Sequence, residues 1–357
     1  MSDFRIDKIT NRDGSTGTQI AGISTFSGTS GMQLPVGPTE YRGGRGRGIF
    51  GGGYDGSHNR TVTINKIEIA TTGNAIDFGD IGSQAASGGS TSNSTRGLFI
   101  SGYTPGSYVG MTYVTLSSEG GGSYFGDLSY VTRDGPWGTG DNTRGVFGGS
   151  AGAPGNMGTP AGLGVNYIDY ITFATTGDST DFGDLLIARR GLGGCSSPTR
   201  AVWGGGYIKP QNQTKTVDVV TIQTTGNAVK FGELTVARGG MGAVASSTRG
   251  IWYGGSIYGP DAPAYTIYNT IDYITIASNG NGVDFGDTRF GNSGIHFTTG
   301  AVSNKIRGCF GGGSTPSIQN DIMYITIATT GDAADFGDLT ASEYNKAGAS
   351  DSHGGLG

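Results

Sequence analysis

One pattern of apolar and polar positions recurs along the chain and predicts its strands. The clearest copy, at residues 271–287, is I-D-Y-I-T-I-A-S-N-G-N-G-V-D-F-G-D. Its first strand is apolar on both faces, because Ile271 and Tyr273 alternate with Ile274 and Ile276. A strand of this kind is typical of a sheet enclosed between two other sheets. A polar turn containing Gly follows, and a second predicted strand ends in F-G-D.

The F-G-[DE] ending occurs six times, so the pattern is an internal repeat. Its Phe residues are separated by 47 to 57 residues and are Phe78, Phe125, Phe182, Phe231, Phe285 and Phe336. Near-copies of the whole stretch occupy residues 64–80, 168–184, 217–233 and 321–338, and a degenerate copy occupies residues 111–127. A period of roughly 50 residues indicates an architecture in which units bury their apolar faces against their neighbours.

Each repeat contains the elements of a four-stranded sheet. A strand that begins with Arg and ends in Gly-rich residues precedes the stretch described above. A short segment of small residues, such as 192–197 or 241–246, precedes that strand. Small residues suit an innermost strand at a crowded axis, where larger side chains would clash. We therefore predict an all-β protein, with a six-bladed β-propeller over residues 41–357.

The C-terminal residues are predicted to complete this ring. Residues 37–46 are too rich in Arg and Gly to form the innermost strand of blade one. Residues 345–351, N-K-A-G-A-S-D, have the small side chains that this strand needs. We predict that they close blade one, which would remove two open sheet edges.

Residues 1–40 do not follow the repeat and are predicted to form a short β arm and a linker. Apolar and polar residues alternate around Asp13-Gly14, a strong hairpin signal, and Pro35 and Pro38 indicate the linker. A hairpin is not stable alone, so we expect the arm to dock on the propeller, a second copy or another protein. The apolar side chains that it offers are Phe4, Ile6, Ile9, Ile20, Ile23 and Phe26.

Composition agrees with an ordered β protein. Gly accounts for 71 of 357 residues without a G-X-Y period, while aromatic residues reach 10% and charged residues only 14%, the opposite of a disordered chain. The net charge is -5, and the single short basic stretch at residues 42–47 does not favour nucleic-acid binding. Neither a membrane-spanning run nor a signal peptide is evident, so we expect no membrane insertion. Cys195 and Cys309 lie at different repeat positions and are expected to be buried thiols.

Two charged positions recur in every repeat and are predicted to form structural ion pairs. Six equivalent pairs are what a scaffold needs to join strands or blades by bidentate hydrogen bonds, with a charged binding ring as the alternative. The arginines are Arg47, Arg96, Arg144, Arg200, Arg249 and Arg307. The acids are Asp80, Asp127, Asp184, Glu233, Asp287 and Asp338.

The repeats differ most in the loop that follows the Gly-rich strand. This loop is long in blade three (residues 150–165) and blade five (residues 256–269), and in a propeller all six such loops leave one face. Aromatic residues there suit contact with a glycan or a protein, although they could simply pack the loops together. The candidate ligand-binding residues in these loops are Tyr103, Tyr108, Tyr207, Tyr258 and Tyr265, together with Trp137 in the neighbouring insertion before blade three.

Signs of catalytic chemistry are weak. His58, His296 and His353 lie at different repeat positions, whereas a metal centre needs several ligands at one point. The Gly-rich stretches do not open helices, so a phosphate cradle is not expected, and no G-x-S-x-G elbow stands out. We therefore expect no enzymatic activity, no catalytic residues, no metal and no cofactor.

Two resemblances extend this interpretation. The succession of R-x-G-x-[GA], a Gly-Gly strand and an aromatic-Gly-acid ending resembles the kelch repeat over residues 41–357. Phe-Gly-Asp stands where kelch has Trp, and the kelch Tyr is present only in part, at Tyr170, Tyr273 and Tyr324. The Y-I-T-I-A-T-T-G-N-A-x-D-F-G-D-L repeats look like Gly-rich propeller proteins of marine cyanophages. The opening I-T-N-R-D-G-S-T-G-T-Q-I-A-G also resembles a segment shared among structural proteins of such phages.

The phage resemblance implies a virion protein, assembled in the host cytoplasm, whose arm docks on other virion proteins. The leading hypothesis is a non-enzymatic structural protein that decorates the particle or belongs to its neck (collar) or its tail. The alternative is an adhesin that binds a host receptor or surface glycan through the loop-bearing face. An enzyme or a cellular interaction hub is the third hypothesis, and self-association on the particle is left open.

Overall fold

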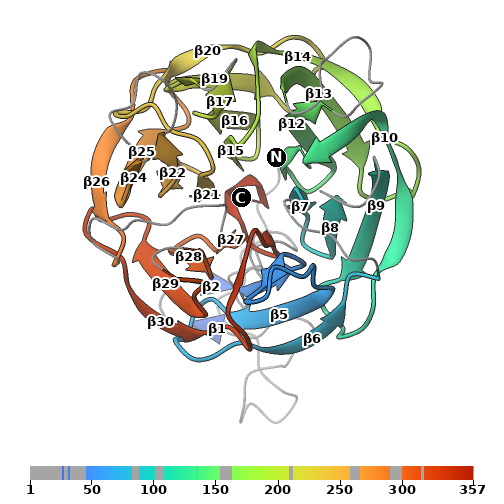
Figure 1. Cartoon of the computed structure of the whole chain (residues 1–357), viewed down its shortest axis with the longest axis vertical. Helices are drawn as coiled ribbons and strands as arrows, with labels where there is room; N and C mark the ends of the chain where they lie inside the picture. Colours follow the sequence, from blue (N-terminus) through green and yellow to red (C-terminus); the bar gives the residue numbers. More distant parts are fainter. Residues whose placement is uncertain are drawn as a thin grey trace.

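A computed structural model describes residues 26–27, 31–32, 46–82, 88–100, 108–134, 136–152, 163–208, 212–257, 266–289, 300–314 and 317–356. Six blades of four antiparallel strands each surround a central axis, so the predicted six-bladed β-propeller is confirmed (Figure 1). The chain passes round the ring once, and its C-terminal end lies at the axis (Figure 1). In addition to the blades, β1 (Phe26–Ser27) pairs with β2 (Gly31–Met32), and the predicted turn at Asp13-Gly14 lies outside the described residues.

The blades follow one another in sequence, and the four strands of each blade lie side by side in order from the axis to the rim. From the innermost to the outermost strand, blade one is β32 (Ala347–Ser350), β3 (Arg47–Gly51), β5 (Thr63–Glu68) and β6 (Ile76–Asp80). Blade two is β7 (Ser90–Ser92), β8 (Arg96–Ile100), β9 (Tyr108–Thr115) and β10 (Ser123–Asp134). Blade three is β11 (Trp137–Gly140), β12 (Arg144–Gly152), β13 (Gly164–Thr172) and β14 (Thr180–Arg189).

The second half of the ring has the same plan. Blade four is β15 (Gly193–Ser196), β16 (Arg200–Gly204), β19 (Thr216–Thr221) and β20 (Val229–Glu233). Blade five is β21 (Gly242–Ala245), β22 (Arg249–Tyr253), β25 (Thr270–Thr275) and β26 (Val283–Asp287). Blade six is β27 (Gly300–Ser303), β28 (Arg307–Gly311), β29 (Asp321–Thr326) and β30 (Ala334–Asp338).

A few short elements lie outside this plan. Three small pairs accompany the blades: β4 (Tyr54–Asp55) with β31 (Glu343–Tyr344), β17 (Tyr207–Ile208) with β18 (Asn212–Gln213), and β23 (Ser256–Ile257) with β24 (Thr266–Ile267). The last described residues form a 3-10 turn, η2 (Gly354–Leu356). Blades two and three are also joined directly, because β10 pairs with β12.

The hydrophobic core lies between blades, as the apolar pattern on both strand faces predicts. Between blades four and five, for example, Val219 and Phe231 pack with Trp252 and Ile274. The same arrangement continues across the point where the ring closes, since Phe50 and Ile67 of blade one pack with Phe336 of blade six. Each blade therefore shields the faces of its neighbours, and the core is shared between them.

The outer edge of each blade is covered by its neighbour. The amide of Gly73 in the T-T-G-N turn of blade one donates to the carbonyl of Phe336 in blade six (2.8 Å), and the amide of Ala75 donates to Asp338 (2.7 Å). The same bond from the turn glycine to the F-G-[DE] phenylalanine recurs at all six junctions, at 2.7 to 3.0 Å. The two most regular motifs of the repeat are thus partners across a blade boundary, and together they remove the exposed strand edge.

Near the axis, serines join the innermost strands in pairs. Ser92, Ser196 and Ser303 lie on blades two, four and six. Each hydroxyl donates to the carbonyl of one residue on the preceding blade and accepts from the amide of that same residue, which is Ser350, Gly140 or Ala245 respectively. The backbone groups that face the axis at these points are thereby satisfied.

The small residues near the C-terminus form the innermost strand of blade one and close the ring, as predicted. β32 pairs with β3 in antiparallel register, from Gly48 opposite Ser350 to Gly51 opposite Ala347. We call the face where the second strands begin with Arg, and where residues 351–356 lie, the tail face. We call the opposite face, where the second strands end and the segments of variable length leave, the loop face. The described propeller begins at Gly46, next to Arg47, and therefore on the tail face.

Candidate functional site at the axis of the propeller

The predicted pairing of the six arginines with the six F-G-[DE] acids is wrong. In blade five, Arg249 lies opposite Thr275 at the end of β25, whereas Asp287 lies opposite Thr270 at its start. Five residue steps along a strand separate the two charges by roughly 17 Å. The other five blades have the same register, so the arginines lie on the tail face and the acids on the loop side of the rim.

The arginines do join blade to blade, but through backbone carbonyl groups. The Nη1 of Arg249 donates to Ile327 (3.1 Å) and Ala328 (2.8 Å) of blade six, while its guanidinium lies 4.6 Å from the ring centre of Tyr273 in its own blade. The equivalent carbonyl acceptors for Arg47, Arg96, Arg144, Arg200 and Arg307 are Leu116, Phe173, Ile222, Ile276 and Ile69. These contacts make the arginines part of the scaffold.

The acids make no common set of ion pairs among the described residues. Glu233 pairs with Lys230 (2.9 Å) and Lys215 (3.5 Å), and the bond from Lys230 is the main cause that lowers its pKa. Asp287 shows the opposite behaviour, because desolvation and then the negative charge of Asp332 raise its pKa. The charged ring therefore has no common electrostatic role.

Buried ion pairs exist at positions that the repeat does not reveal. Arg189 at the end of β14 pairs with Asp218 on β19 (2.9 Å), and Arg238 pairs with Asp272 on β25 (3.0 Å), with all four side chains fully buried. Burial lowers the pKa of Arg189, and the negative charge of Asp218 opposes that shift. The available signal was an acid inside an apolar strand, because a buried carboxylate needs a partner.

The predicted ligand-binding residues lie in different kinds of position. Tyr103, Tyr258 and Tyr265 lie outside the described residues, and Tyr108 begins β9 without a described side chain. Tyr207 is half-buried, and its hydroxyl bonds the carbonyl of Gly239 (3.0 Å) and the hydroxyl of Ser256 (2.8 Å). It therefore packs blade four against blade five, which is the alternative role considered for the loop tyrosines. Of the arm residues, Phe26 lies in β1 opposite Met32, and Phe4, Ile6, Ile9, Ile20 and Ile23 lie outside the described residues.

Trp137 is the candidate that stands apart. It is the first residue of β11, at the loop-face end of the axis, where the equivalent residues of the other blades are Gly89, Gly193, Gly242, Gly300 and Ala347. At two of these positions the next blade's aromatic residue fills the adjoining space: a Cβ on Gly193 would be 2.5 Å from Cδ1 of Trp252, and one on Gly300 would be 2.6 Å from Cδ1 of Phe50. Trp203 fills that space beside blade three and donates to the Trp137 carbonyl (2.9 Å), so the Trp137 side chain is left half-buried.

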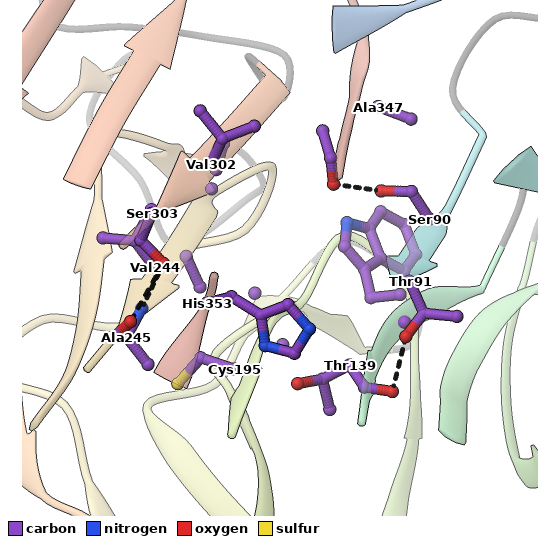
Figure 2. A pocket seen from close by; sticks show the side chains of 18 of the residues that line it. Ser90, Thr91, Thr139, Cys195, Val244, Ala245, Val302, Ser303, Ala347 and His353 are labelled. Carbon is purple, nitrogen blue, oxygen red and sulfur yellow. Dashed lines mark hydrogen bonds between the residues drawn. The ribbon is translucent and has the colours of Figure 1, made fainter. Parts of the chain in front are cut away.

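A small cavity lies on the axis among the six innermost strands. Its volume is about 100 Å³, and Trp137, Ser90, Thr139, Val302, Lys346 and several glycines line it. Figure 2 shows the imidazole of His353 near the centre of the view, with Thr139, Cys195 and Ala245 around it. A typical binding pocket for a drug-sized ligand is several times larger, so this cavity suits a single small ring or a few waters.

The C-terminal tail closes the tail-face end of the cavity. The Nδ1 of His353 accepts from the amide of Gly355 (3.1 Å), and so its Nε2 donates to the carbonyl of Ser92 (2.8 Å). Gly354 and Gly355 lie so close to neighbouring strands that a Cβ on Gly355 would be 1.8 Å from the carbonyl oxygen of Gly140. Burial lowers the pKa of His353, which agrees with a neutral ring that uses both nitrogens.

The ammonium group of Lys346, which lines the cavity, is already engaged in an ion pair and a hydrogen bond. Lys346 is buried, donates to the carbonyl of Gly52 (2.9 Å) and pairs with Glu343, which in turn accepts from Asn65. Burial lowers the pKa of Lys346, and the charge of Glu343 opposes the shift. The surface offered to a ligand therefore combines glycine backbone, hydroxyl groups, aliphatic side chains, one indole and the imidazole of His353, without a free charge among the described lining residues.

Comparisons with known proteins add no assignment to this picture. The chain matches no protein-family model, and it matches no curated protein. The fold defines the class as a six-bladed β-propeller. Within the described ranges, no helix is long and apolar enough to cross a membrane, and no three His, Cys, Asp or Glu side chains are placed to hold a metal ion. Both cysteines are buried and free, and burial raises the pKa of each thiol.

Proposed function

We propose that this chain is a non-enzymatic structural protein of a phage particle, anchored by its N-terminal arm and displaying the propeller outward. The observation that carries the proposal is the opposition of the two faces. The arm joins the disc at Gly46 on the tail face, while the segments of variable length leave the loop face. Anchoring through residues 1–45 would therefore leave the loop face directed away from the particle.

The hydrogen bonds of the recurring arginines and of the C-terminal tail support a structural role. The recurring arginines bond carbonyl groups of the next blade, and His353 bonds the tail to blade two. These side chains hold the disc rigid and closed. Variable loops on a rigid support are a common arrangement for display and recognition. The resemblance of the N-terminal segment to phage structural proteins supplies the particle as the partner.

Deleting residues 1–36 tests the anchoring role. We expect the truncated protein to be absent from purified particles, while its circular dichroism and melting temperature match those of the full chain, because the described ring begins at Gly46. Residues 1–45 fused to an unrelated folded protein should be incorporated into particles. Incorporation of the truncated protein, or exclusion of the fusion, would contradict the proposal. Absence of the intact protein from purified particles would favour a cellular role.

A second candidate function is recognition of a host receptor or surface glycan by the loop face. One observation favours it: the near six-fold repetition of small residues at the loop-face end of the axis is broken by Trp137. Scaffold positions repeat round a ring, whereas a binding site usually breaks the symmetry. Binding of host lipopolysaccharide, compared between the intact protein and Tyr258→Ala and Tyr265→Ala variants, tests the contribution of the blade-five loop.

A further inference from the structure

The three tryptophans of the chain differ in their surroundings. Trp203 and Trp252 are fully buried between blades, and each donates its indole N–H to a carbonyl of the preceding blade. Trp137 is half-buried, and it is the one of the three that lines the axial cavity. The slot between blades three and four is filled by Trp203, so packing alone does not explain why a large side chain is used at position 137.

The surroundings of Trp137 restrict the kind of ligand. Gly138 and Gly194 also line the cavity, and Ser90, whose hydroxyl donates to the carbonyl of Gly348 (2.7 Å), adds an oxygen that can still accept a hydrogen bond. Lys346 contributes no free charge, because Glu343 and Gly52 already satisfy it. The combination of one aromatic face with uncharged polar groups fits a ring that is apolar on one face and carries hydroxyls at its edge.

We infer that Trp137 forms the stacking surface of a subsite for one neutral sugar ring at the loop-face end of the axial cavity. The C–H face of a pyranose would lie on the indole, because C–H groups carry partial positive charge and the indole face is negative. The sugar hydroxyls would meet glycine backbone and Ser90. A charged sugar gains nothing there, and the cavity of about 100 Å³ limits the site to a single ring.

This inference deepens the second candidate function, recognition at the loop face, and does not depend on anchoring to a particle. Fluorescence offers a direct measurement, because the two other tryptophans are fully buried and a ligand at the surface reports on Trp137. The full-length protein is titrated with the methyl pyranosides of glucose, galactose and mannose, and with glucuronate as the charged comparison. We expect a saturable change in emission for at least one neutral sugar and none for glucuronate.

Substitutions assign the site. Trp137→Leu retains apolar packing against blade four but removes the aromatic face, and we expect its Kd, measured by calorimetry, to rise at least about tenfold, the equivalent of roughly 1.4 kcal/mol. Trp137→Phe should bind with intermediate affinity. Tyr207→Phe removes a hydroxyl elsewhere on the loop face and should leave Kd unchanged. Melting temperatures establish that each variant is folded.

Two results would overturn the inference: no saturable change with any of the three neutral sugars, or an unchanged Kd in folded Trp137→Leu. Incorporation of the same variant into particles is measured separately and is expected to be normal. We expect Trp137→Leu to lose sugar binding but to be incorporated normally, and the arm deletion to bind sugar but not to be incorporated. Because the two measurements are independent, failure of the sugar subsite is distinguished from failure of the anchoring proposal.

Discussion

The carboxylate of Asp351 accepts a hydrogen bond from the backbone amide of Arg47 at 2.9 Å, across 304 residues of sequence. In the other blades, the same amide is bonded by a residue only three positions earlier: Asn93, Asp141, Ser197, Ser246 or Asn304. The turn between the first and second strands of blade one is thus assembled from both ends of the described propeller. Asp351 replaces the side chain that a continuous hairpin would supply.

Asp351→Ala should weaken this junction. The variant leaves a partly buried amide without its acceptor, so we expect the free energy of unfolding to fall by about 1–3 kcal/mol in urea denaturation. Asp351→Asn is the matched control, because Asn93 and Asn304 serve the same purpose in blades two and six. Equal stability of the Ala and Asn variants would show that this bond does not help to hold the ring closed.

Stability should depend on pH through His353. Burial lowers its pKa below the ordinary value of 6.5, so the unfolded chain binds a proton more readily than the folded chain. The contribution of neutral His353 to the free energy of unfolding is therefore fully present above pH 6.5 and is lost as the pH falls below that value. The nearby Asp141 opposes the shift, while Gly355 and Ser92 fix the tautomer. The urea midpoint measured between about pH 5 and pH 7 should fall more steeply for the wild type than for His353→Gln. Parallel curves would contradict this role.

The buried pair of Arg189 and Asp218 gives a contrast between single and double substitutions. Asp218→Ala leaves a buried guanidinium without its counter-ion, and we expect a loss of about 3–5 kcal/mol in the free energy of unfolding. Arg189→Met combined with Asp218→Leu removes both charges and should be close to the wild type in stability. A double variant as unstable as Asp218→Ala would mean that the contribution of this pair is not electrostatic.

Gly337 tests the contact between neighbouring blades at the rim. Its φ is 145°, and a Cβ there would be 2.5 Å from the carbonyl oxygen of Gly73 in blade one. Gly337→Ala should therefore lower the free energy of unfolding by about 1–3 kcal/mol. Gly56→Ala, at a glycine with open space around it, is the control and should change the melting temperature little.

The repeat and the number of blades could be predicted because they depend on features that every copy shares. A strand apolar on both faces needs a neighbour on each side, and six copies separated by similar lengths form a ring. The closing strand was also predictable, since residues 347–350 are as small as the other innermost strands. Local composition was sufficient for these conclusions.

Side-chain partners were less predictable. Arg249 and Asp287 recur together in sequence, yet the register of β25 places them at opposite ends of a strand. Arg189 and Arg238 were missed because a comparison of repeats favours positions that all copies share, and these two belong to single junctions. For Trp137, the sequence indicated an exposed aromatic residue, but its relation to the axis depends on Trp203 in the next blade.

The position of β32 has a consequence for synthesis of the chain. Residues 347–350 leave the ribosome after all six second strands have been made, so blade one has only three strands while the rest of the disc can already assemble. A chain that stopped before residue 347 would leave the inner edge of β3 unpaired. Completion of blade one is therefore one of the last steps in the assembly of the described ring.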